Sequence, residues 1–160
     1  MVRRRVGIAV LCAALLASTG CAATGPDSPA VQEWMDAETE RLQERPGVAV
    51  VMTSRTASGA SVDEAGSISS AFPEPLSLAE IEFACSGGGQ TRVRVTLTTP
   101  DGGGSMNSSS DHGPFSCGGQ THVVPLAGLA GAAAAVDIDV AGFGATVDGA
   151  WSAAVIQDIP

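Results

Sequence analysis

The sequence lacks lysine and tyrosine altogether, and only 4% of its 160 residues are aromatic. With so few large rings, small side chains must supply most of the core. The eight basic residues are all arginines, three of them within the first five positions, whereas all 17 acidic residues follow Cys21. A chain starting at Cys21 would therefore carry five arginines against 17 acids, a formal charge of −12. Because such a charge repels phosphate backbones, we expect no nucleic acid partner.

The first 21 residues have the layout of a secretory signal. Three arginines at positions 3–5 precede an uncharged apolar run over residues 6–17, and small residues then lead to Cys21. The run is shorter than the roughly 20 apolar residues of a membrane-spanning helix. We therefore expect residues 1–20 to be a signal peptide.

The segment Ser-Thr-Gly-Cys that ends at Cys21 resembles the lipobox of bacterial lipoproteins. The resemblance implies that the thiol of Cys21 receives a diacylglycerol and that a peptidase cuts just before it. The protein would then be held at the outer face of the cell membrane, with residues 21–28 as a flexible tether. Two alternatives stay open, namely ordinary signal cleavage near Ala23, which releases a soluble protein, and an uncleaved anchor.

A helix is predicted for residues 29–46. Ser28 followed by Pro29 is a typical start, with an N-cap and a proline at the first helical position, and a Pro-Gly pair ends the pattern. The apolar side chains form a single stripe, so we expect the helix to pack on the rest of the domain with Trp34 facing inward rather than toward a partner.

Residues 47–160 are predicted to form an antiparallel β-sandwich. Several segments alternate apolar and polar residues with a period of two, as strands do that cover a core on one side. Two long stretches rich in Ser, Gly and Ala, 53–70 and 100–114, are predicted to be loops. The expected inward-facing residues are Val48, Val50, Met52, Ile81, Phe83, Cys85, Val93, Val95, Leu97, Val136, Ile138, Val140, Val147, Trp151, Ala153 and Val155.

Two glycine turns follow similar sequences, Cys-Ser-Gly-Gly-Gly-Gln-Thr and, 32 positions later, Cys-Gly-Gly-Gln-Thr. We expect the first turn to join residues 79–86 and 91–99 in a hairpin. A three-residue loop would place Glu82 opposite Arg94 on the solvent face of that hairpin.

Cys85 and Cys117 are predicted to form a disulfide. After signal cleavage and lipidation of Cys21 they are the two thiols left, and in an oxidising compartment such a pair in a small domain is usually bonded. Both cysteines also lie at strand ends before similar turns. The alternative is two separate buried cysteines, which behave as small apolar residues.

From Ala79 to Ile156 the chain resembles small actinobacterial lipoproteins of unassigned function. The resemblance rests on a strand, a cysteine, a glycine-rich turn and a second strand, then a second cysteine and a closing Asp-Gly-Ala-Trp segment. It implies a disulfide-bearing, jelly-roll-like sandwich in the cell envelope. It brings no catalytic residues to this chain.

No catalytic or metal site is predicted, and no cofactor is expected. His112 and His122 lack further ligands at metal-binding spacing, and no Gly-x-Ser-x-Gly motif occurs. Asp137 and Asp139 share a strand face and could bind calcium, but a solvated acidic face explains the pair equally well. Trp151 could stack on a sugar, although burial between sheets is its expected fate.

Two functional classes stay open. The preferred prediction is an exported, lipid-anchored binding or interaction domain without chemistry of its own, whose partner is cell-wall polysaccharide or an envelope protein. The alternative is a secreted hydrolase with dispersed catalytic residues. A deep pocket that gathers a histidine and carboxylates would favour the hydrolase, and a shallow surface would favour binding.

The first prediction concerns the anchor. We expect Cys21→Ser to abolish membrane attachment, because the serine hydroxyl does not replace the thiol that carries the lipid. Fractionation of expressing cells measures this, with Cys12→Ser, a change inside the signal segment, as the control. A Cys21→Ser protein that remained fully in the membrane fraction would contradict lipidation.

Overall fold

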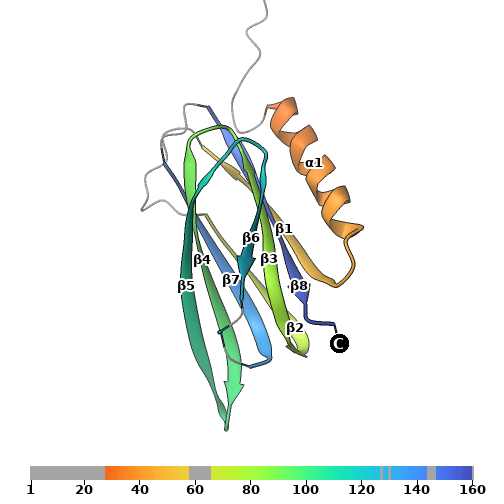
Figure 1. The fold of residues 1–160 in the computed structure, drawn as a ribbon, viewed down its shortest axis with the longest axis vertical. Helices are drawn as coiled ribbons and strands as arrows, with labels where there is room; N and C mark the ends of the chain where they lie inside the picture. The colour runs from red at the N-terminus through yellow and green to blue at the C-terminus, as the bar shows by residue number, and fades with distance from the viewer. Residues whose placement is uncertain (1–27, 58–65, 127, 130, 144–146, 160) are drawn as a thin grey trace, which may run out of the picture.

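The computed structural model describes residues 28–57, 66–126, 128–129, 131–143 and 147–159. Within these ranges the chain forms one helix and eight strands, which pack as two four-stranded antiparallel sheets (Figure 1). The predicted fold class, an antiparallel β-sandwich preceded by one helix, is confirmed. The expected signal peptide and the lipidation site at Cys21 lie outside the described residues.

The strand order is that of an eight-stranded jelly roll. The first sheet has the order β1-β8-β3-β6 and the second sheet has the order β2-β7-β4-β5. The β4–β5 hairpin stays within one sheet, and the other connections cross from one sheet to the other. The strands are β1 (Val48–Thr56), β2 (Gly66–Leu76), β3 (Leu78–Ser86), β4 (Gln90–Asp101), β5 (Gly104–Ser116), β6 (Thr121–Pro125), β7 (Ala133–Phe143) and β8 (Gly149–Gln157).

The core between the two sheets consists mainly of the inward-facing residues of the four central strands, joined by Met52 of β1 and Val124 of β6. Phe83 and Trp151 are the largest fully buried side chains, and their ring centroids lie 6.2 Å apart. Most of the other core residues are Val, Ile or Ala, as the scarcity of aromatic residues requires. The buried residues on the central strands include Ile81, Phe83, Cys85, Val93, Val95, Leu97, Val136, Ile138, Val140, Trp151, Ala153 and Val155.

Helix α1 (Pro29–Gln43) packs on the outer face of the first sheet. Its N-cap is Ser28, whose side chain accepts a hydrogen bond from the backbone N–H of Val31. Leu42 is fully buried against Ala154 and Ile156 of β8. Because the core covers the other face of β8, this strand is buried along both faces and its burial does not alternate. The predicted inward side of the helix is partly confirmed, since Trp34 is half-buried.

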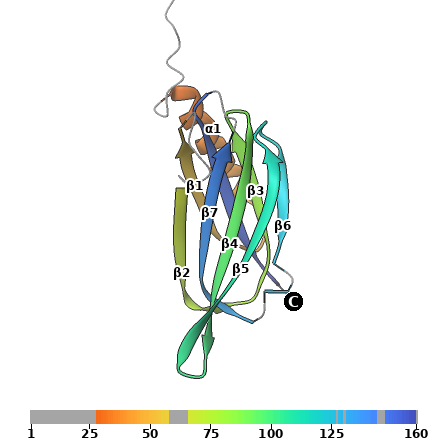
Figure 2. The same cartoon turned by 90° about the vertical axis from the view of Figure 1, so that its left-hand side faces the viewer.

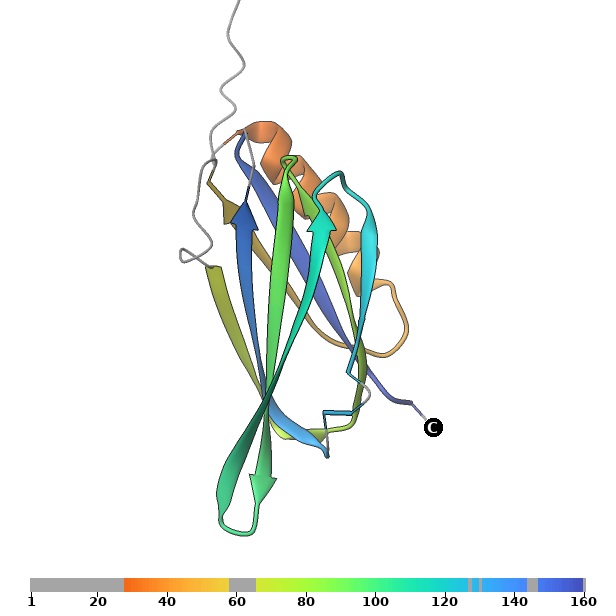
Figure 3. The ribbon, with the colours of Figure 1, turned by 60° about the vertical axis from the view of Figure 1, so that its left-hand side comes forward.

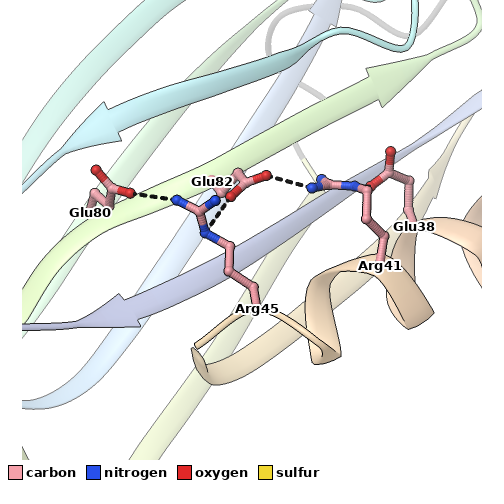
Figure 4. A network of polar contacts seen from close by, with 5 residues as sticks. All are labelled: Glu38, Arg41, Arg45, Glu80 and Glu82. Atoms are coloured by element: carbon pink, nitrogen blue, oxygen red, sulfur yellow. Dashed lines mark hydrogen bonds and ion pairs between the residues drawn. The ribbon is translucent and has the colours of Figure 1, made fainter. Parts of the chain in front are cut away.

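A buried carboxylate joins the helix to the first sheet (Figure 4). Glu82 on β3 is only 4% exposed, and its two oxygens lie 2.6 Å from a guanidinium nitrogen of Arg41 and 2.7 Å from Nε of Arg45. Arg41 also pairs with Glu38 at 2.8 Å, and Arg45 with Glu80 at 3.1 Å. Burial alone would lower the pKa of Arg41, but the hydrogen bonds to Glu82 and Glu38 raise it overall.

The predicted hairpin between residues 79–86 and 91–99 is wrong. β3 and β4 belong to different sheets, and the glycine turn carries the chain from one sheet to the other. Glu82 therefore lies beneath the helix, and the partner of Arg94 is Asp111 on β5. Alternation identified the buried faces of β3, β4 and β7, although Val147, also expected to face inward, is exposed. Strands that face each other across a core, however, alternate in the same way as strands paired within a sheet.

The described residues of the two predicted loops are largely in strands. β1 continues to Thr56 and β2 begins at Gly66, so much of 53–70 is extended, while residues 58–65 lie outside the described residues. The stretch 100–114 forms most of β5, and the β4–β5 hairpin projects beyond the other strands (Figure 3). β5 is an edge strand with mostly exposed side chains. An exposed edge strand needs no apolar face, so the apolar alternation that marks a strand is missing here.

Substitution of Glu82 and substitution of its two arginine partners should have unequal effects on stability. Removing both arginines (Arg41→Ala/Arg45→Ala) leaves the Glu82 carboxylate buried without a partner and should lower the free energy of unfolding by about 3 kcal/mol or more. Glu82→Met should cost only about 1 kcal/mol, because both arginines are about two-fifths exposed and can turn to water. Urea unfolding of the disulfide-bonded chain measures both values.

The control for this comparison is Glu40→Ala, at an exposed position of α1, which should change the free energy of unfolding by less than about 0.5 kcal/mol. Equal destabilisation by Glu82→Met and by the double arginine variant would contradict this expectation. It would mean that the Glu82 carboxylate stabilises the fold, rather than being a buried charge that the arginines must compensate.

Candidate functional site

The outer face of the second sheet is polar, and the described helix does not cover it. Helix α1 contacts β1 and β8 of the first sheet, so it lies on the opposite side of the molecule (Figure 2). Strand register places the outward side chains of the second sheet in rows that run across the four strands. The rows are Ser67, Asp139, Arg94 and Asp111, then Ser69, Asp137, Thr96 and Ser109, then Ala71, Ala135, Thr98 and Asn107.

Cross-strand contacts order these rows. Arg94 holds Asp111 through two nitrogens, with Nε to Oδ1 at 2.8 Å and a terminal nitrogen to Oδ2 at 3.2 Å. Thr96 contacts the hydroxyl of Ser109 at 2.8 Å, Thr98 donates to Asn107 at 2.9 Å, and Ser69 donates to Asp137. The hydrogen bond from Arg94 lowers the pKa of Asp111 and raises that of Arg94, so both groups stay charged at neutral pH.

A hollow of about 410 Å³ opens on this face, at the end of the first row. The residues around it are two arginines, two aspartates, His112, Gly113 and Ala141. Because His112 pairs with the buried Val93, its side chain lies on the inner face of β5, whereas the arginines and aspartates point outward. Sequence reasoning missed the hollow. The available signal was the Gly-Pro pair at 113–114, which interrupts a strand and indicates a bulge. The lining residues are Arg92, Arg94, Asp111, His112, Gly113, Asp139 and Ala141.

His112 does not form the set of groups that a hydrolase needs. Its Nε2 lies 2.8 Å from the hydroxyl of Ser110, two residues before it on β5. Such a pair becomes a nucleophile and base when a third group orients the histidine. The adjacent carboxylate, that of Asp111, is instead held by Arg94. The other histidine, His122, stacks on Phe115 with ring centroids 4.5 Å apart.

The two aspartates proposed as calcium ligands lie on this same face. Asp137 and Asp139 are both half-buried, and each faces a polar partner: Asp137 contacts Ser69, and Asp139 lies opposite Arg94. In the part of the chain that the structure describes, no group of three or more His, Cys, Asp or Glu side chains could hold a metal ion. Calcium normally takes six or more oxygens, more than these two carboxylates supply.

Trp151 is fully buried between the sheets, as predicted, so it does not reach a ligand on the surface. Its indole nitrogen has no hydrogen-bond partner among the described groups. The outward residues of the second sheet named above include no aromatic ring. Recognition on this face would therefore rest on hydrogen bonds and charge rather than on stacking.

The predicted disulfide is confirmed. Cys85 at the end of β3 is bonded to Cys117 just after β5, with Cα atoms 4.6 Å apart. Since β3 belongs to the first sheet and β5 to the second, the bond links the two sheets. Both cysteines are buried, at 2% and 8% exposure.

The two similar glycine turns lie side by side at the disulfide. The N–H of Gly88 donates to the carbonyl of Cys117, the N–H of Cys117 to the carbonyl of Gly89, and the N–H of Gly119 to the carbonyl of Cys85. Both turns cross between the sheets, in opposite directions. The internal similarity of the sequence thus corresponds to two equivalent crossings that hydrogen-bond to each other.

The chain matches no model of a known protein family and no curated protein sequence. Among the described residues, no helix has the length and apolar character of a membrane span. The site must therefore be interpreted from its own geometry.

The disulfide should contribute a large part of the stability. Cys85→Ala/Cys117→Ala removes a link between residues 32 apart, and in the chain-entropy model this lowers the free energy of unfolding by about 3–4 kcal/mol. Urea unfolding of the variant and of the wild type measures the difference, and wild-type protein reduced and alkylated under denaturing conditions is the control. A loss below about 1 kcal/mol would contradict the expectation.

Proposed function

We propose that this chain is an exported, lipid-anchored protein of the cell envelope whose sandwich is a non-catalytic binding domain. The anchor is the diacylglycerol on Cys21, and the binding surface is the outer face of the second sheet. The protein would then belong with the small actinobacterial lipoproteins that its sequence resembles. The signal layout, the lipobox-like segment and the confirmed disulfide support export.

One observation carries the choice of surface. A sandwich has two outer faces, and helix α1 occupies that of the first sheet through Leu42 and the Glu82 pairs. The outer face of the second sheet instead presents ordered polar side chains and a hollow. Small-molecule sites are concave and carry a few polar groups that fix the orientation of the ligand, and of the two outer faces this one has both features.

The tether would also set the orientation of this surface. Six residues separate Cys21 from Ser28, and even fully extended they span only about 20 Å. The start of α1 would thus lie close to the membrane, as would the glycine turns at the same end of the sandwich (Figure 1). The tip of the β4–β5 hairpin, at the opposite end, would point away from the membrane. The strands of the second sheet would then run roughly perpendicular to the membrane surface.

Two observations favour the hydrolase alternative: the lining of the hollow includes His112 and two aspartates, and the hydroxyl of Ser110 lies 2.8 Å from Nε2 of His112. Strand register separates these groups, because His112 and Ser110 lie opposite the buried Val93 and Val95, whereas Asp111 lies opposite the outward Arg94. The engagement of Asp111 by Arg94 removes the nearest carboxylate that could orient this histidine. Binding is therefore the better-supported function. A hydrolase would need a base whose orientation is fixed by a further group.

Retention on envelope material tests the proposal. The mature chain with Cys21→Ser, exported and purified with its disulfide intact, is passed over cell-wall polysaccharide and over envelope proteins. Thr96→Lys/Thr98→Lys places two charges in the middle of the second-sheet face, and we expect at least a tenfold loss of retention. The matched control, Ala37→Lys/Gln43→Lys, adds the same charge at exposed positions of α1 and should retain binding.

Equal retention by the two double variants would overturn the assignment of the surface. Turnover of ester, amide or glycoside substrates that Ser110→Ala abolishes would overturn the non-catalytic function in favour of the hydrolase. Circular dichroism of each variant shows whether it is folded.

A further inference from the structure

The hollow on the second sheet is created by the backbone. Arg92 lies opposite Ala141 on one side, and on the other side the β4–β5 register shifts, so that Thr91 pairs with Phe115 and Val93 with His112. The neighbours of Arg92 on both adjacent strands therefore lack bulky side chains. The floor of the hollow lies at Ala141 and Gly113, where the outward side chains are small or absent.

Gly113 makes this geometry possible. Its φ of +104° is a conformation that other residues rarely adopt, and a Cβ at this position would lie 2.9 Å from the carbonyl oxygen of Thr91. Any side chain here would distort the bulge or fill the hollow. The hollow is thus a specific feature of the strand pair.

The charges around the hollow are balanced. Arg92 and Arg94 contribute two positive charges, and Asp111 and Asp139 contribute two negative charges. The ion pair of Arg94 with Asp111 neutralises one charge of each sign, and Asp139 lies opposite Arg94 on its other side. The two carboxylates would repel an anion that entered the hollow, and the two guanidinium groups would repel a cation, so the charged groups disfavour ligands of either sign.

We propose that the hollow binds a neutral, polyhydroxylated ligand, namely a segment of an uncharged polysaccharide. Hydroxyl groups donate to the carboxylates of Asp111 and Asp139 and accept from the guanidinium groups of Arg92 and Arg94. Neighbouring hydroxyls on a sugar ring match the paired oxygens of a carboxylate and the paired nitrogens of a guanidinium. This inference rests on the proposed function, since it names the ligand of the same face.

The charge of the whole protein favours the same ligand. The net charge of −9 repels anionic polymers from the surface, whereas a neutral chain approaches without that penalty. Because the lining residues include no Phe, Tyr or Trp for stacking on a sugar, we expect weak affinity, with a Kd on the order of 1 mM for a short oligosaccharide.

The test follows the ¹H–¹⁵N spectrum of the lipid-free mature chain during titration. The probes are N-acetylchitohexaose and cellohexaose as neutral chains, and oligogalacturonate as an anionic chain of similar length. We expect one or both neutral probes to shift the amides of residues 111–113 and 139–141, and oligogalacturonate to leave them unchanged. Ala141→Leu fills the hollow and should weaken binding at least tenfold.

The matched control is Ala135→Leu, at an outward position on the same strand but outside the hollow, which should change affinity less than twofold. Both variants keep a strand-compatible side chain, and their amide spectra show whether the fold is intact. Tighter binding of oligogalacturonate in the hollow, absence of shifts with both neutral chains at tens of millimolar, or equal affinity of the two variants would each overturn the inference.

The outcome also separates this inference from the proposed function. If Ala141→Leu keeps the envelope retention that Thr96→Lys/Thr98→Lys loses, the second-sheet face binds something other than a neutral polysaccharide in the hollow. If both variants keep that retention, the proposed surface itself is wrong.

Discussion

The buried carboxylate of Glu82 is the constraint on which the arrangement of the molecule depends. A charged group at 4% exposure is tolerated only because two guanidinium groups reach it, that of Arg41 in the last turn of α1 and that of Arg45 two residues beyond the helix. Those pairs fix where the helix crosses the first sheet, and Leu42 fills the space that the small residues of β8 leave. Since the helix covers β1 and β8, the second sheet presents the broader uncovered strand surface among the described residues.

A core of small side chains has a second consequence. Val, Ala and Ile bury little area each, so the apolar contribution to stability per residue is modest. Cross-links that act at a distance from the core then matter more. The bond between Cys85 and Cys117 joins the two sheets where both chains pass through glycine turns, which offer no side chains to pack. The covalent link and the backbone hydrogen bonds hold an end of the sandwich that apolar contacts could not.

The sequence predicted those strands in which burial of one face makes apolar and polar residues alternate. The central strands β3, β4 and β7 alternate because one face meets the core, and each was found from that pattern. β2 and β5, the edge strands of the second sheet, were missed. Their burial alternates only between half-buried and exposed positions, and several of the half-buried residues are serines, so the sequence shows little apolar alternation. Partner choice was also hidden: nothing near Glu82 in the sequence identifies Arg41, which lies 41 positions earlier. The hollow depends on the bulge at Gly113, and only a Gly-Pro pair signals it.

Because the protein has no lysine, every positive side-chain charge that pairs with a carboxylate comes from an arginine or a histidine. Arginine presents a planar, permanently charged fork that pairs with a carboxylate through two nitrogens, whereas lysine is a flexible point charge. Two of the five arginines after Cys21 fix the helix, and two others line the hollow. The hollow is therefore a locally neutral site on a strongly acidic protein. The negative charge of the whole protein repels anionic ligands, and at short range the guanidinium and carboxylate groups of the hollow select for hydroxyls. Because the proposed ligand is neutral, its binding should depend little on salt concentration.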